Sequence, residues 1–204
     1  MGVYYFPANF VYWQQVKDHD KIKDVLLKEI YKRGDVSNGD LGLYAASTNY
    51  KEDQSLLNGY DQNIIKNIVW DPLENAIDEF NSGDSTKKIS FKESRIVNSW
   101  YTYYKEGGNF ALHNHCGDSK NSFSMIYILK DENEHNRTIF TELSNDYIST
   151  TSDCIEDTLF DTSSVKDIKE GSVLIFPSSL YHYVHSVKIP GRITIAINIV
   201  SFNS

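Results

Sequence analysis

From about residue 88 onward, the chain is a dense series of short segments rich in aromatic and β-branched residues, and this feature constrains the fold most. Such residues pack well on pleated sheets, so we expect these segments to be β-strands. The expected strands cover 88–93, 95–105, 109–115, 122–130, 137–143, 163–168, 172–177, 181–187 and 192–202. The polar segment 144–162 predicts a long crossover loop, with a short strand near Leu159. Eight or so antiparallel strands in two sheets would form a jelly roll, or double-stranded β-helix.

The first part of the chain has helical rather than strand periodicity. Apolar residues recur at helical spacing over 18–33, where Asp20 is a candidate cap, and again over 60–81, where Pro72 should kink or split the helix. The segment 34–60 is predicted to be a long loop. Residues 1–16 are predicted to form an edge strand or a segment that crosses the core. Helices followed by strands indicate an α+β fold. We expect one domain over 1–204, with 1–87 supporting a jelly-roll core over 88–204 and the helices packed on the larger sheet.

Two histidines, His113 and His115, are separated by a single residue in one of the expected strands. Alternate residues of a strand point to the same face, so both imidazoles should reach one point in space. Gly107 and Gly108 supply a turn just before them. Because imidazole is the commonest metal ligand among side chains, the pair is a candidate half of a metal site. A pair of surface histidines is the alternative interpretation.

A second stretch of chemical interest begins with the strand-turn-strand pattern of 171–185, which carries His182. Arg192 follows at the start of an apolar strand. By strand parity it shares a face with Thr194, Ala196 and Asn198. A buried arginine needs an anion, which is either a protein carboxylate or the carboxylate of a ligand. The residues alone leave both possibilities open.

These motifs, in this order, resemble those of the Fe(II)- and 2-oxoglutarate-dependent oxygenases over residues 94–202. The prolyl 4-hydroxylase pattern Y-x-x-G-G-x-Y-x-x-H-x-D is similar to the stretch from Tyr104 to His115. The short bacterial and phage oxygenases have three further patterns. Their S-G-V-Y-Y-L is similar to 124–129, their G-x-L-V-x-F-P-x-x-x-x-H to 171–182, and their R-I-S-I-A-F-N to 192–198. The resemblance covers the whole β portion of the chain.

The resemblance implies a set of roles for particular residues. It implies that His113, His115 and His182 are the ligands of Fe(II). It also implies that Arg192 binds the distal carboxylate of 2-oxoglutarate and that O2 is the second cosubstrate. It also places Thr194, Tyr104, Ser124 and Asn198 in the cosubstrate pocket. The family often has a tyrosine at the position of Ile128, whereas Tyr127 should point outward. The implied reaction is hydroxylation of a C–H bond, and the leading substrate is a peptidyl proline.

One departure from the family pattern leaves alternatives open. Most families have a carboxylate where this chain has His115, so a metal held by three neutral imidazoles would keep one more positive charge. Asp118 is the alternative carboxylate ligand. Cupins share the jelly roll and have similar motifs around His113 and His182, but they leave Arg192 unexplained. A jelly roll that binds another protein without catalysis is the third possibility.

Composition bears on partners and location. The net charge is −8 and no block of Lys or Arg is present, which argues against nucleic acid or an anionic membrane as a partner. We see no secretory signal and no apolar run long enough for a membrane helix, so we expect a cytoplasmic protein, in the host cytoplasm if the chain is phage-encoded. The expected partner is a peptide, protein or small-molecule substrate. The loops 34–60 and 144–162 are candidate lids, and the oligomeric state is left open.

Overall fold

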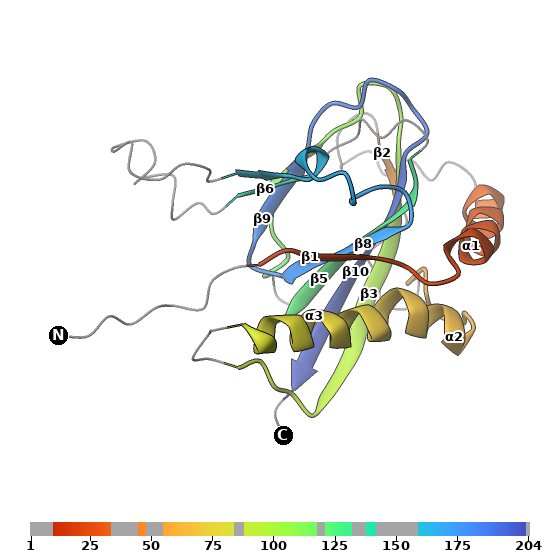
Figure 1. The fold of residues 1–204 in the computed structure, drawn as a ribbon. Helices are drawn as coiled ribbons and strands as arrows, with labels where there is room; N and C mark the ends of the chain where they lie inside the picture. The colour runs from red at the N-terminus through yellow and green to blue at the C-terminus, as the bar shows by residue number, and fades with distance from the viewer. Residues whose placement is uncertain are drawn as a thin grey trace, which may run out of the picture.

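The computed structural model describes residues 10–33, 45–47, 55–83, 88–117, 121–131, 138–141 and 159–202. Two antiparallel sheets dominate the fold, with few helices (Figure 1). The larger sheet has the order β1-β8-β5-β10-β3-β2, and its strands are Tyr12–Gln15, Ser172–Pro177, Phe123–Lys130, Ile193–Phe202, Glu93–Tyr104 and Ala45–Ser47. The smaller sheet has the order β4-β9-β6-β7, with strands Phe110–His113, Tyr181–Val184, Thr138–Thr141 and Leu159–Asp161. The predicted edge strand within 1–16 is therefore β1.

Alternation along β10 separates two faces of the larger sheet. The isoleucines at 193, 195, 197 and 199 are buried in a cluster that also contains Leu26 and Leu73 from the helical part of the chain. Each fully buried side chain of this size contributes about 1.5–3 kcal/mol of burial free energy. Thr194 and Ala196, on the other face, line a pocket between the sheets. A second apolar cluster between the sheets joins residues such as Leu174 and Phe176 of β8 with Phe140 of β6. The parity predicted for this strand is confirmed.

The helices begin with α1, which spans His19–Arg33, so that Asp20 lies in its first turn and not at the cap position. The second predicted helix is divided into α2, Gln62–Ile65, a π-helical turn over Lys66–Trp70 and α3, Asp71–Ser82. Pro72 lies in the first turn of α3, directly after the π-helical turn, where its missing N–H leaves a carbonyl of the preceding turn without a helical partner. Pro72 is predicted to kink or split this helix; the hydrogen-bond pattern is interrupted just before it, while the backbone stays helical at Ile65, Trp70 and Asp71. Among the described residues, no helix has the length and apolar character needed to cross a membrane.

Two predicted strands are wrong, and side chains explain both. Residues 88–92 are not in a strand, because the Asn81 side chain accepts a hydrogen bond from Ile89 N at 2.7 Å and donates one to Ile89 O at 2.8 Å. Residues 163–168 are not a strand either, because a 3₁₀ turn spans Thr162–Ser164. The Asp161 carboxylate accepts from Ser163 N at 2.9 Å, a local contact that competes with strand pairing. The short strand predicted near Leu159 is confirmed as β7, Leu159–Asp161.

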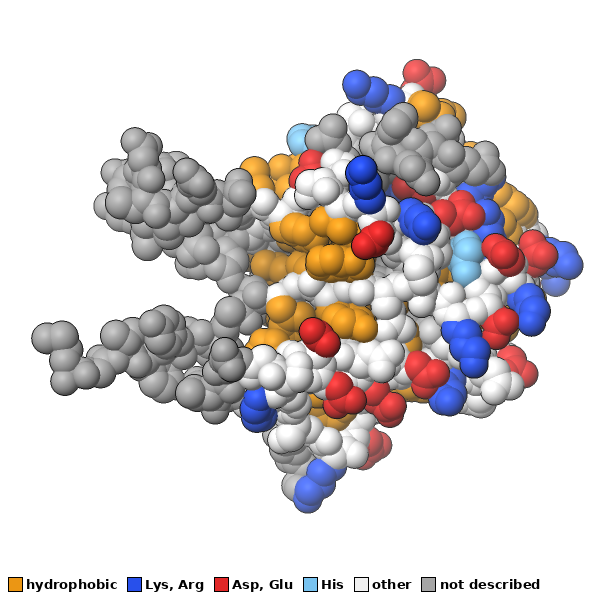
Figure 2. Space-filling model, viewed as in Figure 1, with side chains coloured by type: hydrophobic (Ala, Val, Ile, Leu, Met, Phe, Trp, Pro, Cys, Tyr) orange, Lys and Arg blue, Asp and Glu red, His pale blue; other side chains and the backbone are white. Residues whose placement is uncertain are grey.

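Charged side chains are mixed on the face of the molecule drawn in Figure 2. Lys, Arg, Asp and Glu side chains alternate over the end of the molecule where α1 lies, and the described Lys and Arg residues do not join into a continuous basic patch on this face.

Candidate metal and cosubstrate site

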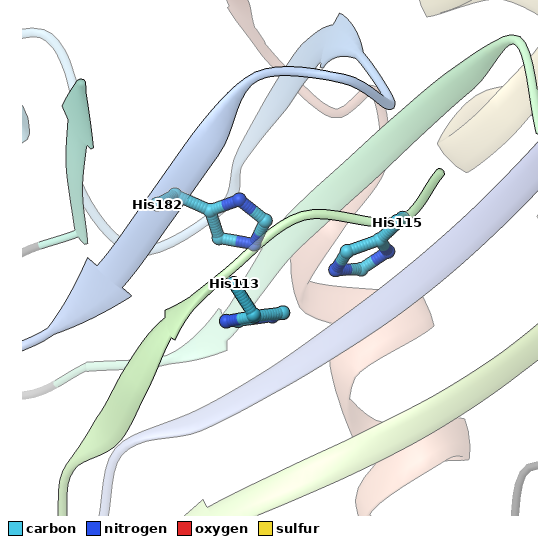
Figure 3. A group of neighbouring side chains, drawn as sticks. All are labelled: His113, His115 and His182. Carbon is cyan, nitrogen blue, oxygen red and sulfur yellow. The ribbon is translucent and has the colours of Figure 1, made fainter. Parts of the chain in front are cut away.

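Three histidine side chains converge between the two sheets (Figure 3). His113 ends β4, His182 lies in β9, and the two are cross-strand partners. His115 lies in a bend two residues beyond His113. One ligand atom from each of the three residues lies within 4.8 Å of the other two. A metal ion about 2.1 Å from each ring nitrogen needs nitrogens roughly 3 to 4 Å apart, so small ring rotations would bring all three into coordination.

The hydrogen bonds of the three imidazoles select the nitrogen that is available to a metal. Nδ1 of His113 lies 2.7 Å from Ala111 O, and Nδ1 of His182 lies 3.2 Å from Leu180 O. Nδ1 of His115 lies 2.6 Å from Asn198 Oδ1. All three acceptors are carbonyl-type oxygens, so each Nδ1 carries the proton and each Nε2 keeps its lone pair. This pattern is the one that ligating histidines show in metal proteins.

The electrostatics of the cluster also favour neutral rings. Burial lowers the pKa of His115 to about 4, and the hydrogen bond to Asn198 opposes that shift. Burial and the neighbouring imidazoles lower the pKa of His182 well below its usual value, and burial lowers the pKa of His113. Metal ligation requires neutral imidazole. The residues present therefore fit a divalent ion at this place.

Arg192 is the other unusual group of the site. Its side chain is buried, with a residue exposure of 1%, although an arginine side chain carries a permanent charge. Nη2 donates to Thr138 Oγ1 at 3.2 Å, and Nε lies 3.8 Å from Asp131 Oδ2, too far for a hydrogen bond. Among the described residues, Nε and Nη1 have no hydrogen-bond acceptor. Buried N–H groups without partners are costly, and they fit a site that is completed by an anion.

The pocket that holds the three histidines is lined by side chains from both sheets; Arg192 does not line it but contacts two lining residues, Thr138 and Tyr104. Apart from the three histidines, the lining residues are Trp100, Thr102, Tyr104, Phe110, Ile126, Thr138, Val184, Thr194 and Ala196. The guanidinium carbon of Arg192 lies 5.4 Å from the centre of the Tyr104 ring. Burial raises the pKa of Tyr104, while Arg192 and a hydrogen bond from Thr194 lower it, so the phenol stays protonated and can donate. The predicted pocket residues Tyr104 and Thr194 thus lie beside Arg192.

Other predicted site residues lie elsewhere. Ser124 and Asn198 do not line the pocket but hydrogen-bond to each other at 2.9 Å behind His115. Tyr127 points to the opposite side of the larger sheet, where its hydroxyl lies 2.7 Å from His19 Nδ1. Asp118 lies outside the described residues, as do nearly all of the predicted lid loops 34–60 and 144–162 except 45–47, 55–60 and 159–162.

Sequence reasoning missed several pocket residues, among them Trp100, Thr102 and Thr138. Thr102 and Trp100 share a face of β3 with Tyr104, so strand parity could have found them. The ring of Trp100 stacks on that of His115, with centroids 5.6 Å apart. Thr138 hydrogen-bonds to Arg192 across 54 positions of sequence, and no local pattern predicts that contact.

A protein-family model described as "Putative 2OG-Fe(II) oxygenase", where 2OG is 2-oxoglutarate, matches residues 98–198. The matched range contains all three histidines and Arg192. Residues 98–198 belong to the 2OG-Fe(II) oxygenases. The enzyme is accordingly an oxidoreductase that depends on 2-oxoglutarate, and its cofactor is iron, for which the three histidines could serve as ligands.

Solved structures share the fold of this oxygenase. A prolyl-4-hydroxylase from Pseudomonas putida matches with a TM-score of 0.59 and 11% identity, over 95% of this chain and 94% of its own. HygX from Streptomyces hygroscopicus, with nickel, 2-oxoglutarate and hygromycin B bound, matches with a TM-score of 0.57 and 12% identity, over 94% and 82%.

A prolyl hydroxylase from Trichoplax adhaerens, in complex with a hypoxia inducible factor peptide fragment, matches with a TM-score of 0.54 and 13% identity, over 94% and 83%. At these identities the likeness shows the fold alone, which is the double-stranded β-helix predicted from the sequence. A search of curated proteins found no match.

Proposed function

We propose that His113, His115 and His182 hold Fe(II) in this oxygenase, and that Arg192 binds the distal carboxylate of 2-oxoglutarate. The observation that carries the proposal is the combination in one pocket of three neutral imidazoles with free Nε2 atoms and, next to it, a buried arginine with two unpartnered N–H groups. A cupin-type metal site accounts for the histidines but gives no reason to bury Arg192.

The donors around Arg192 suit a carboxylate. Because Thr138 Oγ1 accepts from Arg192 Nη2, the Thr138 hydroxyl proton is free to point to another acceptor. The Tyr104 hydroxyl lies beside Thr194, and its raised pKa keeps the proton that it can give to an acceptor in the pocket. Two N–H groups and two O–H groups together match the lone pairs of one carboxylate. These contacts support binding and orientation of the cosubstrate at the inner end of the pocket.

The proposed reaction is hydroxylation of a C–H bond. Iron with 2-oxoglutarate supplies the chemistry in which one atom of O2 is inserted into the C–H bond and the other enters succinate, with release of carbon dioxide. The chain supplies three oriented imidazoles, a fixed cation and apolar walls such as Ile126 and Val184, which exclude water from the cosubstrate. His115 contributes no negative charge, so the metal keeps a charge of about +2 before cosubstrate binds.

We propose a peptide as the substrate, with a prolyl residue as the hydroxylated position. Support comes from the Tyr104 to His115 motif, which is similar to that of prolyl 4-hydroxylases, and from the aromatic rings beside the metal ligands. Phe110 lies 4.7 Å from the His113 ring, and Trp100 stacks on His115. Aromatic walls of this kind pack well against a flat apolar ring such as that of proline.

The test is turnover with peptide. Metal-free protein is loaded with Fe(II) and 2-oxoglutarate, and air is admitted with and without a set of proline-containing peptides and matched alanine peptides. We expect succinate release to rise with a proline peptide and the peptide to gain one oxygen atom by mass spectrometry. Succinate without any dependence on proline would leave the oxygenase in place and reject the peptidyl-proline substrate. A protein that binds metal but never releases succinate would favour the cupin-type alternative, and one that binds no metal would favour the non-catalytic jelly roll.

A further inference from the structure

His115 lies outside regular structure, because β4 ends at His113 and strand geometry cannot place a residue in the bend that follows. Its position depends instead on contacts with distant segments. Its backbone N–H donates to Ser178 O at 2.8 Å, and its carbonyl accepts from Asn121 Nδ2 at 2.9 Å. These two contacts fix the backbone but leave the imidazole free to turn.

We propose that Asn198 is the positioning residue that makes His115 a metal ligand. The inference rests on the proposed function, because it presumes that the three histidines bind a metal. Asn198 is 83 positions away in sequence, 5% exposed, and its Oδ1 lies 2.6 Å from His115 Nδ1. This contact determines both the rotation of the ring and which nitrogen carries the proton, so that Nε2 faces His113 and His182 with its lone pair.

The orientation of the Asn198 amide is itself determined by its neighbours. Ser124 Oγ donates to Asn198 Oδ1 at 2.9 Å, and Asn198 Nδ2 donates to Asn98 Oδ1 at 2.9 Å. Asn98 and Ser124 are the cross-strand partners of Asn198 on β3 and β5. Three adjacent strands of the larger sheet therefore hold one amide oxygen toward His115. Such an arrangement costs two buried polar side chains, Ser124 and Asn198, and the half-buried Asn98, which a purely apolar sheet position would avoid.

An amide oxygen at this place also has an electronic effect. A hydrogen-bond acceptor behind a ligating imidazole increases the electron density that the ring gives to the metal, and removal of such a partner typically lowers metal affinity by about 10- to 100-fold. In most relatives the third ligand brings a negative charge of its own. In this chain His115 is neutral, so the partial negative charge of Asn198 Oδ1 takes over part of that function.

The two ends of the Asn198 side chain allow a positioning role to be separated from a structural one. Asn198→Asp keeps an acceptor for His115 but loses the donor to Asn98, which ties β10 to β3. Asn198→Val suits a strand and keeps neither. Asn81→Leu is the matched control, because it removes two hydrogen bonds of an asparagine to Ile89, far from the site in sequence.

The experiment is an anaerobic titration of the metal-free protein and its variants with Co(II), followed by the visible absorption of the bound ion. We expect Asn198→Val to bind Co(II) about 10- to 100-fold more weakly. Asn198→Asp should bind at least as tightly as the unaltered protein despite its lost Asn98 contact, and Asn81→Leu should bind normally. Equal affinity in Asn198→Val would overturn the inference while leaving the proposed function intact. Failure of the unaltered protein to bind Co(II) would reject the proposed metal site itself.

A second measurement covers the case in which Asn198→Val does not fold. In the Zn(II)-loaded protein, the Nδ1 proton of His115 should give a slowly exchanging NMR signal, because it is buried and hydrogen-bonded. The signal should persist and move downfield in Asn198→Asp, where the acceptor is a carboxylate. Absence of a protected Nδ1 proton on His115 in the unaltered protein would overturn the inference.

Discussion

Replacement of Arg192 by glutamine tests the cosubstrate site at the group that the structure leaves incomplete. Arg192 is buried, its Nη2 is bonded to Thr138, and its Nε and Nη1 have no acceptor among the described residues. A carboxylate that binds both N–H groups gains two hydrogen bonds to a charged donor, each contributing about 1.5–3 kcal/mol. The loss of both predicts that 2-oxoglutarate binds roughly 10²- to 10⁴-fold more weakly to Arg192→Gln.

The assay is anaerobic calorimetric titration of 2-oxoglutarate into Co(II)-loaded protein, with Co(II) affinity measured separately. We expect the Co(II) affinity of Arg192→Gln to equal that of the unaltered protein, because no histidine hydrogen bond involves Arg192. Arg95→Gln is the matched control. Arg95 is exposed and lies over the Phe202 ring, 5.5 Å from its centre, so its loss should leave 2-oxoglutarate binding unchanged.

A different outcome would show that Arg192 is structural. If its main role were to neutralise Asp131, which lies 3.8 Å from Nε, removal of the cation would leave a buried carboxylate without its counter-ion. Breaking a buried pair in this way costs about 3–5 kcal/mol of unfolding free energy. A large loss of stability in Arg192→Gln together with unchanged 2-oxoglutarate affinity would therefore refute the cosubstrate assignment.

Three further predictions follow from the same geometry. In calorimetric titrations, Tyr104→Phe should weaken 2-oxoglutarate binding by about 5- to 10-fold, which corresponds to the loss of one hydrogen bond. The control Tyr127→Phe should leave 2-oxoglutarate binding unchanged, and in urea unfolding it should lower the free energy of unfolding by about 1 kcal/mol. His115→Ala should lose most Co(II) affinity while Asp118→Asn keeps it; the reverse result would make Asp118 the third ligand. Because burial lowers the pKa of His115 from 6.5 to about 4, the metal-free protein should lose stability as pH falls below 6.5, where the unfolded chain binds the extra proton. The urea midpoint should drop between pH 7.5 and 5, less so in His115→Gln, and a flat profile would contradict the burial of neutral histidine.

Much of the site followed from strand periodicity. His182 in β9 and Thr194 in β10 lie on regular strands, so their orientation is determined by position along the chain. The same parity correctly predicts that Tyr127 lies on the opposite face of the sheet, where its hydroxyl contacts His19 of helix α1. Pro72 likewise interrupts the hydrogen-bond pattern of its helix for a local reason, the missing N–H. In each case the decisive physics acts within a few residues.

The remainder depends on contacts between distant segments. His115 was expected on a strand and reaches the metal site by another route, through Ser178, Asn121 and Asn198. The partner of Arg192, Thr138, comes from the opposite sheet. The strand expected over 163–168 gave way to side-chain hydrogen bonds at Asp161. Periodicity carries no information on such contacts, because they arise only when the two sheets are brought together.

The central claim is that the three histidines and Arg192 bind iron and 2-oxoglutarate in one pocket. The most direct measurement is the visible absorption of metal-free protein under anaerobic conditions, on addition of Fe(II) and then 2-oxoglutarate. A metal-to-ligand charge-transfer band should appear only when both are present, and it should be absent in His182→Ala and require far more 2-oxoglutarate in Arg192→Gln. No band in the unaltered protein, together with no succinate after air is admitted, would contradict the account.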